Sequence, residues 1–260
     1  MLNLAIRELY TYRDLLLAWT VRTVRARYQQ SILGGLWAVM QPAATAAIFT
    51  VVFTLFIPLD TGDIPYVVFS YTAMVPWTLF STSITDMVDS LVSNMNLVTK
   101  IYFPRDVLVV AAMAARLVDF VIALTVLLLL MFIYQMPLSW TWLFLPAILL
   151  IQLALMLGIG LIGAALNVFY RDIRHLVVLG LQLWLYATPI IYPVTMVPER
   201  IRSLYFLNPM AGAIEGYRAV LLHGEMPENY IYVSAAAALL IMVGGYWFFK
   251  RVEYKFADIV

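Results

Sequence analysis

Long apolar stretches separated by short polar segments dominate the chain. A membrane-spanning helix needs about 20 mostly apolar residues, because 1.5 Å per residue has to cross about 30 Å of hydrocarbon. Stretches of this kind run over residues 36–57, 66–85, 107–134, 142–168, 176–192 and 231–249. The pattern predicts an all-α polytopic membrane protein with six transmembrane helices in a single domain, residues 1–260, with spans one to five in 36–192.

The first segment, residues 1–33, has a different pattern. Leu17, Val21, Val24 and Tyr28 recur at helical spacing among several arginines. This pattern predicts an N-terminal amphipathic interfacial helix that lies on the membrane surface. A soluble helix packed on a partner is the alternative.

The segment 193–230 contains an apolar run that resembles a seventh span. However, Asn208 and Pro209 interrupt the run, and Glu215 and Arg218 would each cost about 2.5–3.5 kcal/mol at the centre of a membrane. We therefore expect a re-entrant helix hairpin that dips in from one face, with its non-helical backbone shielded by protein or water.

The basic residues orient the spans. All but three of the 16 Lys and Arg residues fall on one side of the six-span model, and the exceptions are Arg200, Arg202 and Arg218. By the positive-inside rule, both termini and the tail at 250–260 are cytoplasmic, and the hairpin is extracytoplasmic.

Composition supports the membrane class. The chain has 64% hydrophobic and 12% charged residues, whereas soluble domains have about 45–50% and about 25%. A net charge of +1 argues against a nucleic-acid partner. The absence of cysteine excludes disulfides and thiolate metal sites, and we expect no metal role for His175 or His223.

Enzymatic motifs are absent from the sequence. A P-loop needs Gly-Lys, but the three lysines follow Thr, Phe and Tyr. Asp86 and Asp89 could form an acid/base pair, although we expect them to be a solvated helix end. Arg116 and Asp119 lie inside the third span at i, i+3 spacing, which favours a structural salt bridge over a proton relay. With no carboxylate at the membrane midplane, the energy for transport has to come from a partner.

Aromatic residues form 14% of the chain. Most of them should belong to interfacial belts or to helix packing. A minority on the second and fifth spans could face a passage, where flat aromatic rings stack on sugar rings. The candidates are Phe69, Tyr71, Trp77, Trp184, Tyr186 and Tyr192.

Several motifs, in order along the whole chain, resemble those of the permeases of type-2 ABC polysaccharide exporters. They are Arg27–Trp37 with Gln41 and Pro42, Lys100–Asp106, Asn167–Ile173, Pro189–Pro193, Asn208 and Pro209 with Gly216–Arg218, and Glu253–Asp258. The resemblance implies a homodimeric permease in the inner membrane, in contact with its lipids and paired with two separate ABC ATPase subunits. ATP and Mg would bind to the ATPase, and this chain would carry no cofactor.

The resemblance also implies the substrate class and the site residues. The substrate would be a lipid-linked polysaccharide, closest to O-antigen, with capsule, teichoic acid or a small lipid or drug as alternatives. An integral membrane lipid-sugar transferase is the runner-up, but it would need a polar catalytic cluster. ATPase coupling maps to Asn94, Lys100, Phe103, Pro104, Arg105, Arg171 and Asp172; the alternative for Arg105 and Arg171 is that they bind lipid phosphates.

We expect the first and fifth spans to line a passage at the dimer axis, because a long polymer needs a continuous path. Candidate passage residues are Trp77, Trp184 and Tyr186. For these aromatics, contact with lipid or packing between helices is the alternative. An outer re-entrant lid would contain Asn208, Pro209, Glu215 and Arg218.

Overall fold

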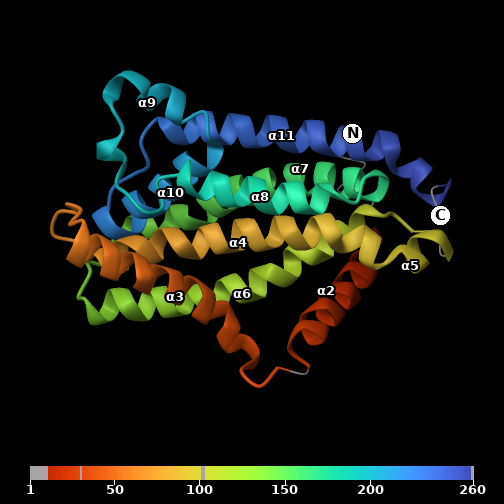
Figure 1. Cartoon of the computed structure of the whole chain (residues 1–260), viewed down its shortest axis with the longest axis horizontal. Helices are drawn as coiled ribbons and strands as arrows, with labels where there is room; N and C mark the ends of the chain where they lie inside the picture. The colour runs from red at the N-terminus through yellow and green to blue at the C-terminus, as the bar shows by residue number, and fades with distance from the viewer. Residues whose placement is uncertain (1–10, 30, 101–102, 259–260) are drawn as a thin grey trace.

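The computed structural model describes residues 11–29, 31–100 and 103–258, and within these ranges every regular element is helical (Figure 1). This agrees with the predicted all-α fold class. The helices are α2 (Arg13–Tyr28), α3 (Trp37–Val51), α4 (Tyr66–Ser93), α5 (Met95–Lys100), α6 (Asp106–Ile133), α7 (Leu145–Phe169), α8 (Ile173–Tyr186), α9 (Glu199–Tyr205), α10 (Pro209–Arg218) and α11 (Tyr230–Val252).

Five helical stretches in the described part of the chain are long and apolar enough to cross a membrane. They are Gly34–Phe56, Tyr66–Ser93, Asp106–Ile133, Trp140–Phe169 and Tyr230–Phe256. These stretches correspond to the first four predicted spans and the last one. The chain is therefore built as a polytopic membrane protein.

The helix at the fifth predicted span, α8, is short. It ends at Tyr186, although the apolar pattern continues to residue 192. Its 14 residues extend about 21 Å at 1.5 Å per residue, which is less than the hydrocarbon thickness of about 30 Å. Pro189 and Pro193 disfavour helix in the residues before them, so the helix does not extend over the whole predicted range.

Helix α4 forms the centre of the bundle, and α3, α6, α7, α8 and α10 pack against it. In its most apolar window 78% of residues are buried, compared with 11% in the first span and 17% in the last. The outer helices expose large apolar side chains such as Leu55 and Leu240, 71% and 74% exposed. Such surfaces need lipid or another apolar partner.

The second predicted span continues beyond its expected end at residue 85. Met87, Val88 and Leu91 are buried and keep one face of α4 packed as far as Ser93. The expectation that Asp86 and Asp89 form a solvated helix end is therefore wrong. Both aspartates are partly buried within the helix, and each pairs with arginine.

Helices α7 and α11 pack with their backbones in contact. A Cβ atom added at Gly158 would lie 2.5 Å from the main chain of Ile241, and one added at Gly245 would meet the backbone of Gly158. Gly160 and Gly163 similarly face side chains of α4. These three glycines therefore permit close packing of α7 against α11 and α4.

The N-terminal helix α2 lies against α6 at one end of the bundle (Figure 1). None of its residues is fully buried. Of the predicted apolar stripe, Leu17 and Val21 stay exposed, whereas Val24 and Tyr28 are half-buried. Contact between the exposed part and a membrane surface remains a prediction.

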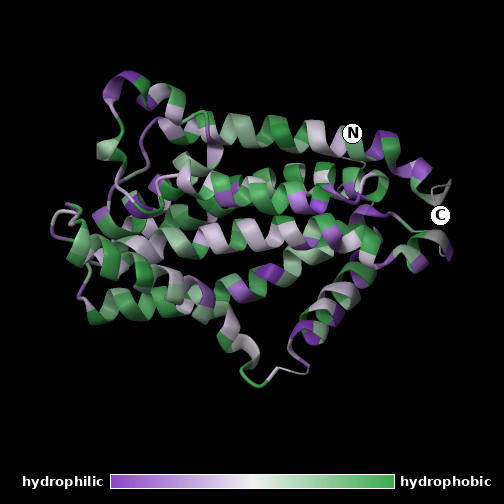
Figure 2. Ribbon diagram, in the orientation of Figure 1, coloured by the Kyte–Doolittle hydropathy of each residue, from purple (hydrophilic) through white to green (hydrophobic). Residues whose placement is uncertain are grey.

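Hydrophobic residues cover the length of the bundle, and hydrophilic ones gather on α2, on α9 and near the ends (Figure 2). Helix α5 and the C-terminal end of α11 lie at one end (Figure 1). Helix α9 and the loop before α4 lie at the opposite end (Figure 1). The predicted coupling residues and the predicted lid therefore lie at opposite ends of the molecule.

Candidate functional site

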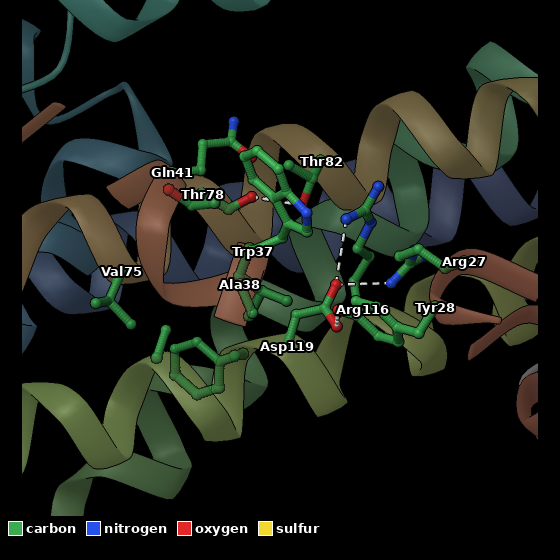
Figure 3. A pocket seen from close by; sticks show the side chains of 13 residues that line it. Arg27, Tyr28, Trp37, Ala38, Gln41, Val75, Thr78, Thr82, Arg116 and Asp119 are labelled. Atoms are coloured by element: carbon green, nitrogen blue, oxygen red, sulfur yellow. Dashed lines mark hydrogen bonds and ion pairs between the residues drawn. The ribbon is translucent and has the colours of Figure 1, made fainter. Parts of the chain in front are cut away.

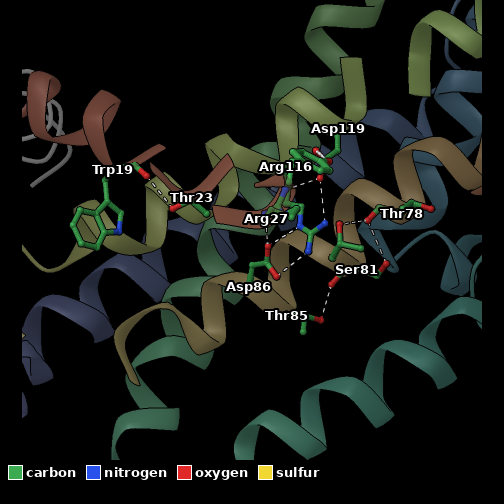
Figure 4. A network of polar contacts seen from close by, with 11 residues as sticks. Trp19, Thr23, Arg27, Thr78, Ser81, Thr85, Asp86, Arg116 and Asp119 are labelled. Atoms are coloured by element: carbon green, nitrogen blue, oxygen red, sulfur yellow. Dashed lines mark hydrogen bonds and ion pairs between the residues drawn. The ribbon is translucent and has the colours of Figure 1, made fainter. Parts of the chain in front are cut away.

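Four charged side chains form a closed network between α2, α4 and α6 (Figure 4). Arg116 donates to both carboxylate oxygens of Asp86, at 2.6 and 3.0 Å, and to Asp119 at 3.1 Å. Arg27 donates to Asp119 at 2.6 Å and to Asp86 at 2.8 Å. The predicted pair of Arg116 and Asp119 is confirmed, but it is only one side of this network.

The charges of the network balance, two positive against two negative. Its side chains are between 12% and 26% exposed. Partly buried ions need their partners, because removing one leaves an uncompensated charge in a medium of low dielectric constant. Since each carboxylate accepts from both arginines, the arrangement favours a structural role over a proton relay.

Tyr28 completes the network from α2. Its hydroxyl donates to Asp119 Oδ1 at 2.5 Å. Burial raises the pKa of the Tyr28 phenol above its ordinary value, and the neighbouring Asp119 raises it further. The phenol therefore stays protonated near neutral pH and acts as a donor that helps to fix the end of α2.

Two hollows adjoin the network, and Arg116 lines both. The first has a volume of about 150 Å³ and lies beside the end of α2 (Figure 3). The second has a volume of about 300 Å³ and lies between α4 and α8. Polar residues shared by the two walls are Gln41, Thr82 and Arg116.

A polar stripe on α4 supplies the walls of these hollows. Its members follow one another at alternating intervals of three and one residues, so that every second member is four residues further on and they share one face of the helix. They are Thr78, Ser81, Thr82, Thr85, Asp86 and Asp89, and all are partly exposed. The opposite face of α4 is the centre of the apolar core. The stripe gives an otherwise apolar bundle a hydroxyl-rich surface that opens between α3 and α8.

The predicted passage aromatics occupy different environments. Trp77 is only 3% exposed, packs 5.4 Å from Phe80, and lines the second hollow. Trp184 meets the same phenylalanine edge-on at 5.2 Å, and its indole N–H donates to Asn208 at 2.9 Å. Tyr186 is 65% exposed. The structure thus brings Trp77 and Trp184 together through Phe80 and leaves Tyr186 on the surface.

Asn208 joins the end of α8 to the start of α10. Its side-chain oxygen accepts from Met210 N at 3.1 Å, which makes it the N-cap of α10, while Pro209 occupies the first helical position. Its amide nitrogen donates to the Ala187 carbonyl at 3.1 Å and to Thr188 at 3.0 Å. The predicted lid residue is therefore bonded to the chain that directly follows α8, within the range predicted for the fifth span.

Arg218 bonds to the next two residues of the same segment, Pro189 and Ile190. It is 1% exposed, donates to the carbonyls of Pro189 and Ile190, and pairs with Glu215 at 2.8 Å. Its guanidinium lies 3.6 Å from the centroid of the Phe69 ring. Because α8 ends at Tyr186, the carbonyls of Pro189 and Ile190 have no helical partners, and the buried Arg218 donates to them instead.

The predicted coupling residues lie at the end of the molecule where α5 is found. Lys100, Arg171 and Asp172 are exposed, whereas Phe103, Pro104 and Arg105 are half-buried. Asn94 is partly buried and donates to the Ser90 carbonyl at 2.8 Å. Arg105 donates to the carbonyl of Glu253 in the C-terminal tail. The exposed residues thus form a surface layer, and the half-buried residues lie beneath them.

Sequence reasoning missed two parts of this site. The partners of Arg27 are 59 and 92 residues away along the chain, and no local pattern connects them. The polar stripe of α4, in contrast, has helical periodicity, and plotting residues 78–89 on a helical wheel would have revealed it.

The side chains of this site offer binding contacts. Across residues 11–29, 31–100 and 103–258, no group of three His, Cys, Asp or Glu residues could hold a metal ion. Asp86 and Asp119 are both held by arginines, so neither is a free general base. Hydroxyl, amide and paired charged groups instead offer many weak contacts to a polar solute.

The comparisons with known proteins give a consistent family. Residues 14–222 match the ABC-2 type transporter family. The chain is 33% identical over 259 residues to the O-antigen export system permease protein RfbA of Myxococcus xanthus, with 98% of each chain covered. It is 32% identical over 249 residues to the protein of that name in Klebsiella pneumoniae, with 95% of each covered. It is 26% identical over 230 residues to the polysialic acid transport protein KpsM of Escherichia coli, covering 85% of this chain and 88% of the relative.

Proposed function

Because the chain belongs to the ABC-2 type transporter family, we propose that it is the membrane-spanning subunit of an ATP-driven exporter of a lipid-linked, O-antigen-like polysaccharide. The observation that carries the proposal is the polar stripe of α4, which opens between α3 and α8 in an otherwise apolar bundle. The relatives of the chain that are named O-antigen export permeases support a polysaccharide as the substrate.

The proposed topology has six crossings with both termini in the cytoplasm. The helix α8 would cross together with the bonded turn that follows it, and the segment from α9 to α10 would be the re-entrant hairpin on the outer face. Burial of Met210, Ile214 and Tyr217 of α10 in the main core supports a hairpin that enters the bundle. The basic residues at the end with α5 support a cytoplasmic location for that end.

A second copy of the chain would complete the passage. Helix α8 exposes Leu176, Leu179, Leu183 and Tyr186, and α3 is also largely exposed. These two helices flank the opening of the polar stripe. In the proposed homodimer the two stripes would face one another across the passage, and the paired charges of the network would not hold the moving polymer strongly.

ATP hydrolysis in this proposal takes place on two separate ABC ATPase subunits, which bind ATP and Mg. Exposed Lys100, Arg171 and Asp172 would contact them. Phe103, Pro104 and Arg105 would support that contact from below, and Asn94 would end the helix that leads into it.

The proposal is tested by co-purification and ATP hydrolysis. The chain is purified with candidate ABC ATPases from the same organism, and hydrolysis is measured with lipid-linked glycans of different structure. A stable complex stimulated by a lipid-linked polysaccharide is the expected result. Stimulation only by a small lipid or drug would contradict the substrate class.

A further inference from the structure

The C-terminal tail, Glu253–Asp258, connects two cytoplasmic segments that are far apart in the sequence. One is formed by α5 and by residues 103–105, and the other is the turn at 170–172 between α7 and α8. We propose that the tail is a third part of the ATPase docking surface, in which Phe256 is a positioning residue that makes the other two segments move as one body. This inference rests on the proposed function.

Phe256 is the anchor of the tail. It is fully buried, and its ring lies 5.8 Å from that of Phe169 and 5.7 Å from that of Phe249, both at steep angles. Phe169 is the last residue of α7 and directly precedes the turn at 170–172. The tail is thus packed against the base of one predicted coupling segment.

Arg105 ties the tail to the other segment. Its guanidinium donates to the Glu253 carbonyl and lies 6.0 Å from the centroid of the Phe256 ring. Helix α5 itself contacts the tail. Because Arg105 is half-buried and bonded to the tail, its role in this surface is to hold the tail.

An ion-pair chain adds a second connection. Lys250, at the end of α11, pairs with Asp106 at 3.2 Å and with Glu253 at 3.4 Å. Asp106 is 2% exposed and opens α6 directly after Arg105. The end of α11, the start of α6 and the tail are therefore fixed to one another.

These contacts belong to a separate apolar core at this end of the bundle. Buried Val98 of α5, Val168 of α7 and Phe256 of the tail share it. Closely packed cores have low compressibility and transmit displacement, whereas independent loops would absorb it. A force applied by an ATPase to α5 would therefore reach the turn at 170–172 and α11 together.

The tail also contributes to the exposed surface. Tyr254 is 63% exposed, and Lys255 is exposed beside it. With Lys100, Arg171 and Asp172, the surface carries three positive charges and one negative. An ATPase surface with excess acidic residues fits this charge, and an exposed tyrosine is a residue type enriched at interface hot spots.

The test compares Phe256→Ala with Phe256→Leu, which keeps apolar bulk, and with Tyr254→Ala, which leaves the tail anchored. Each full-length variant is purified with its ATPase, and glycan-stimulated hydrolysis is divided by basal hydrolysis. We expect Phe256→Ala to lower the ratio of stimulated to basal hydrolysis about tenfold, and Phe256→Leu to restore most of it. Tyr254→Ala should weaken ATPase binding about tenfold.

Three results would overturn the inference. The first is a Phe256→Ala complex with the stimulation ratio of the unaltered chain. The second is a Tyr254→Ala chain that binds the ATPase as tightly as the unaltered chain, because the tail would then form no part of the docking surface. The third is an unaltered chain that binds no ABC ATPase. This result would contradict the proposed function as well, and it differs from the first two because it is seen without any substitution.

Discussion

Arg27, Arg116, Asp86 and Asp119 show how this chain places charge inside an apolar bundle. Each arginine bonds to both aspartates, so the energy of each pair depends on the presence of the others. Removing one member of such a network costs more folding free energy than the sum of the same pairs isolated on a surface.

Replacing Asp119 by alanine should therefore destabilise the protein strongly. Each arginine would lose one of its two aspartate partners, and Tyr28 would lose the carboxylate to which it donates. We expect a loss of about 3 kcal/mol or more in the free energy of unfolding. Denaturant unfolding of the protein in detergent micelles would measure it. The matched control is Asp89→Ala. Asp89 Oδ2 lies 3.3 Å from Nε of Arg174, whose side chain is 59% exposed, so the loss in the free energy of unfolding should stay within about 1 kcal/mol. Equal losses for the two variants would contradict the role given to the network.

What the sequence could reveal at this scale depended on distance along the chain. The pair of Arg116 and Asp119 was predictable because i, i+3 residues face one another on any helix. The contribution of Arg27 was not, because it requires knowing how α2 lies against α6. Asp86 and Asp89 were misplaced because a hydropathy window ends at the first charged residue, although Met87, Val88 and Leu91 keep the helix packed.

The helices were largely predictable, because a span is defined by local composition. Gly34–Phe56, Asp106–Ile133 and Trp140–Phe169 lie close to their predicted ranges. Helix α4 runs past its predicted end, and helix α8 stops short of its own. The end of α8 depends on bonds from Asn208 and Arg218, which follow it in the chain. Pro189 was the available signal that the helix would end early.

At the contact of α7 and α11, Gly158→Ala should separate the two helices. The added methyl group would lie 2.5 Å from the Ile241 backbone, which cannot rotate away as a side chain could. We expect a loss of about 1–3 kcal/mol, measured as a shift in the unfolding midpoint. Gly244→Ala on α11 is the control, because no atom lies within 4 Å of its added Cβ, and it should be neutral or slightly stabilising. A stable Gly158→Ala variant would show that the helix contact is looser than described.

For the whole molecule, the charge distribution predicts which end faces the cytoplasm. The chain has no cysteine, so single cysteines report their own accessibility without background. In intact cells, Glu228→Cys should react with a membrane-impermeant maleimide from outside, and Asn96→Cys should react only after the membrane is opened. Labelling of position 228 from the cytoplasmic side alone would overturn the proposed topology.

The account as a whole claims that this chain, with an ABC ATPase, moves a lipid-linked polysaccharide across a membrane. The most direct measurement uses proteoliposomes that contain the chain, the ABC ATPase that co-purifies with it and a labelled lipid-linked O-antigen-type glycan. Transfer of the glycan to the leaflet opposite the ATPase is followed by its accessibility to a membrane-impermeant glycosidase. We predict transfer that requires ATP and stops when a catalytic variant of the ATPase is used. A complex that hydrolyses ATP while the glycan stays in its original leaflet would contradict the account.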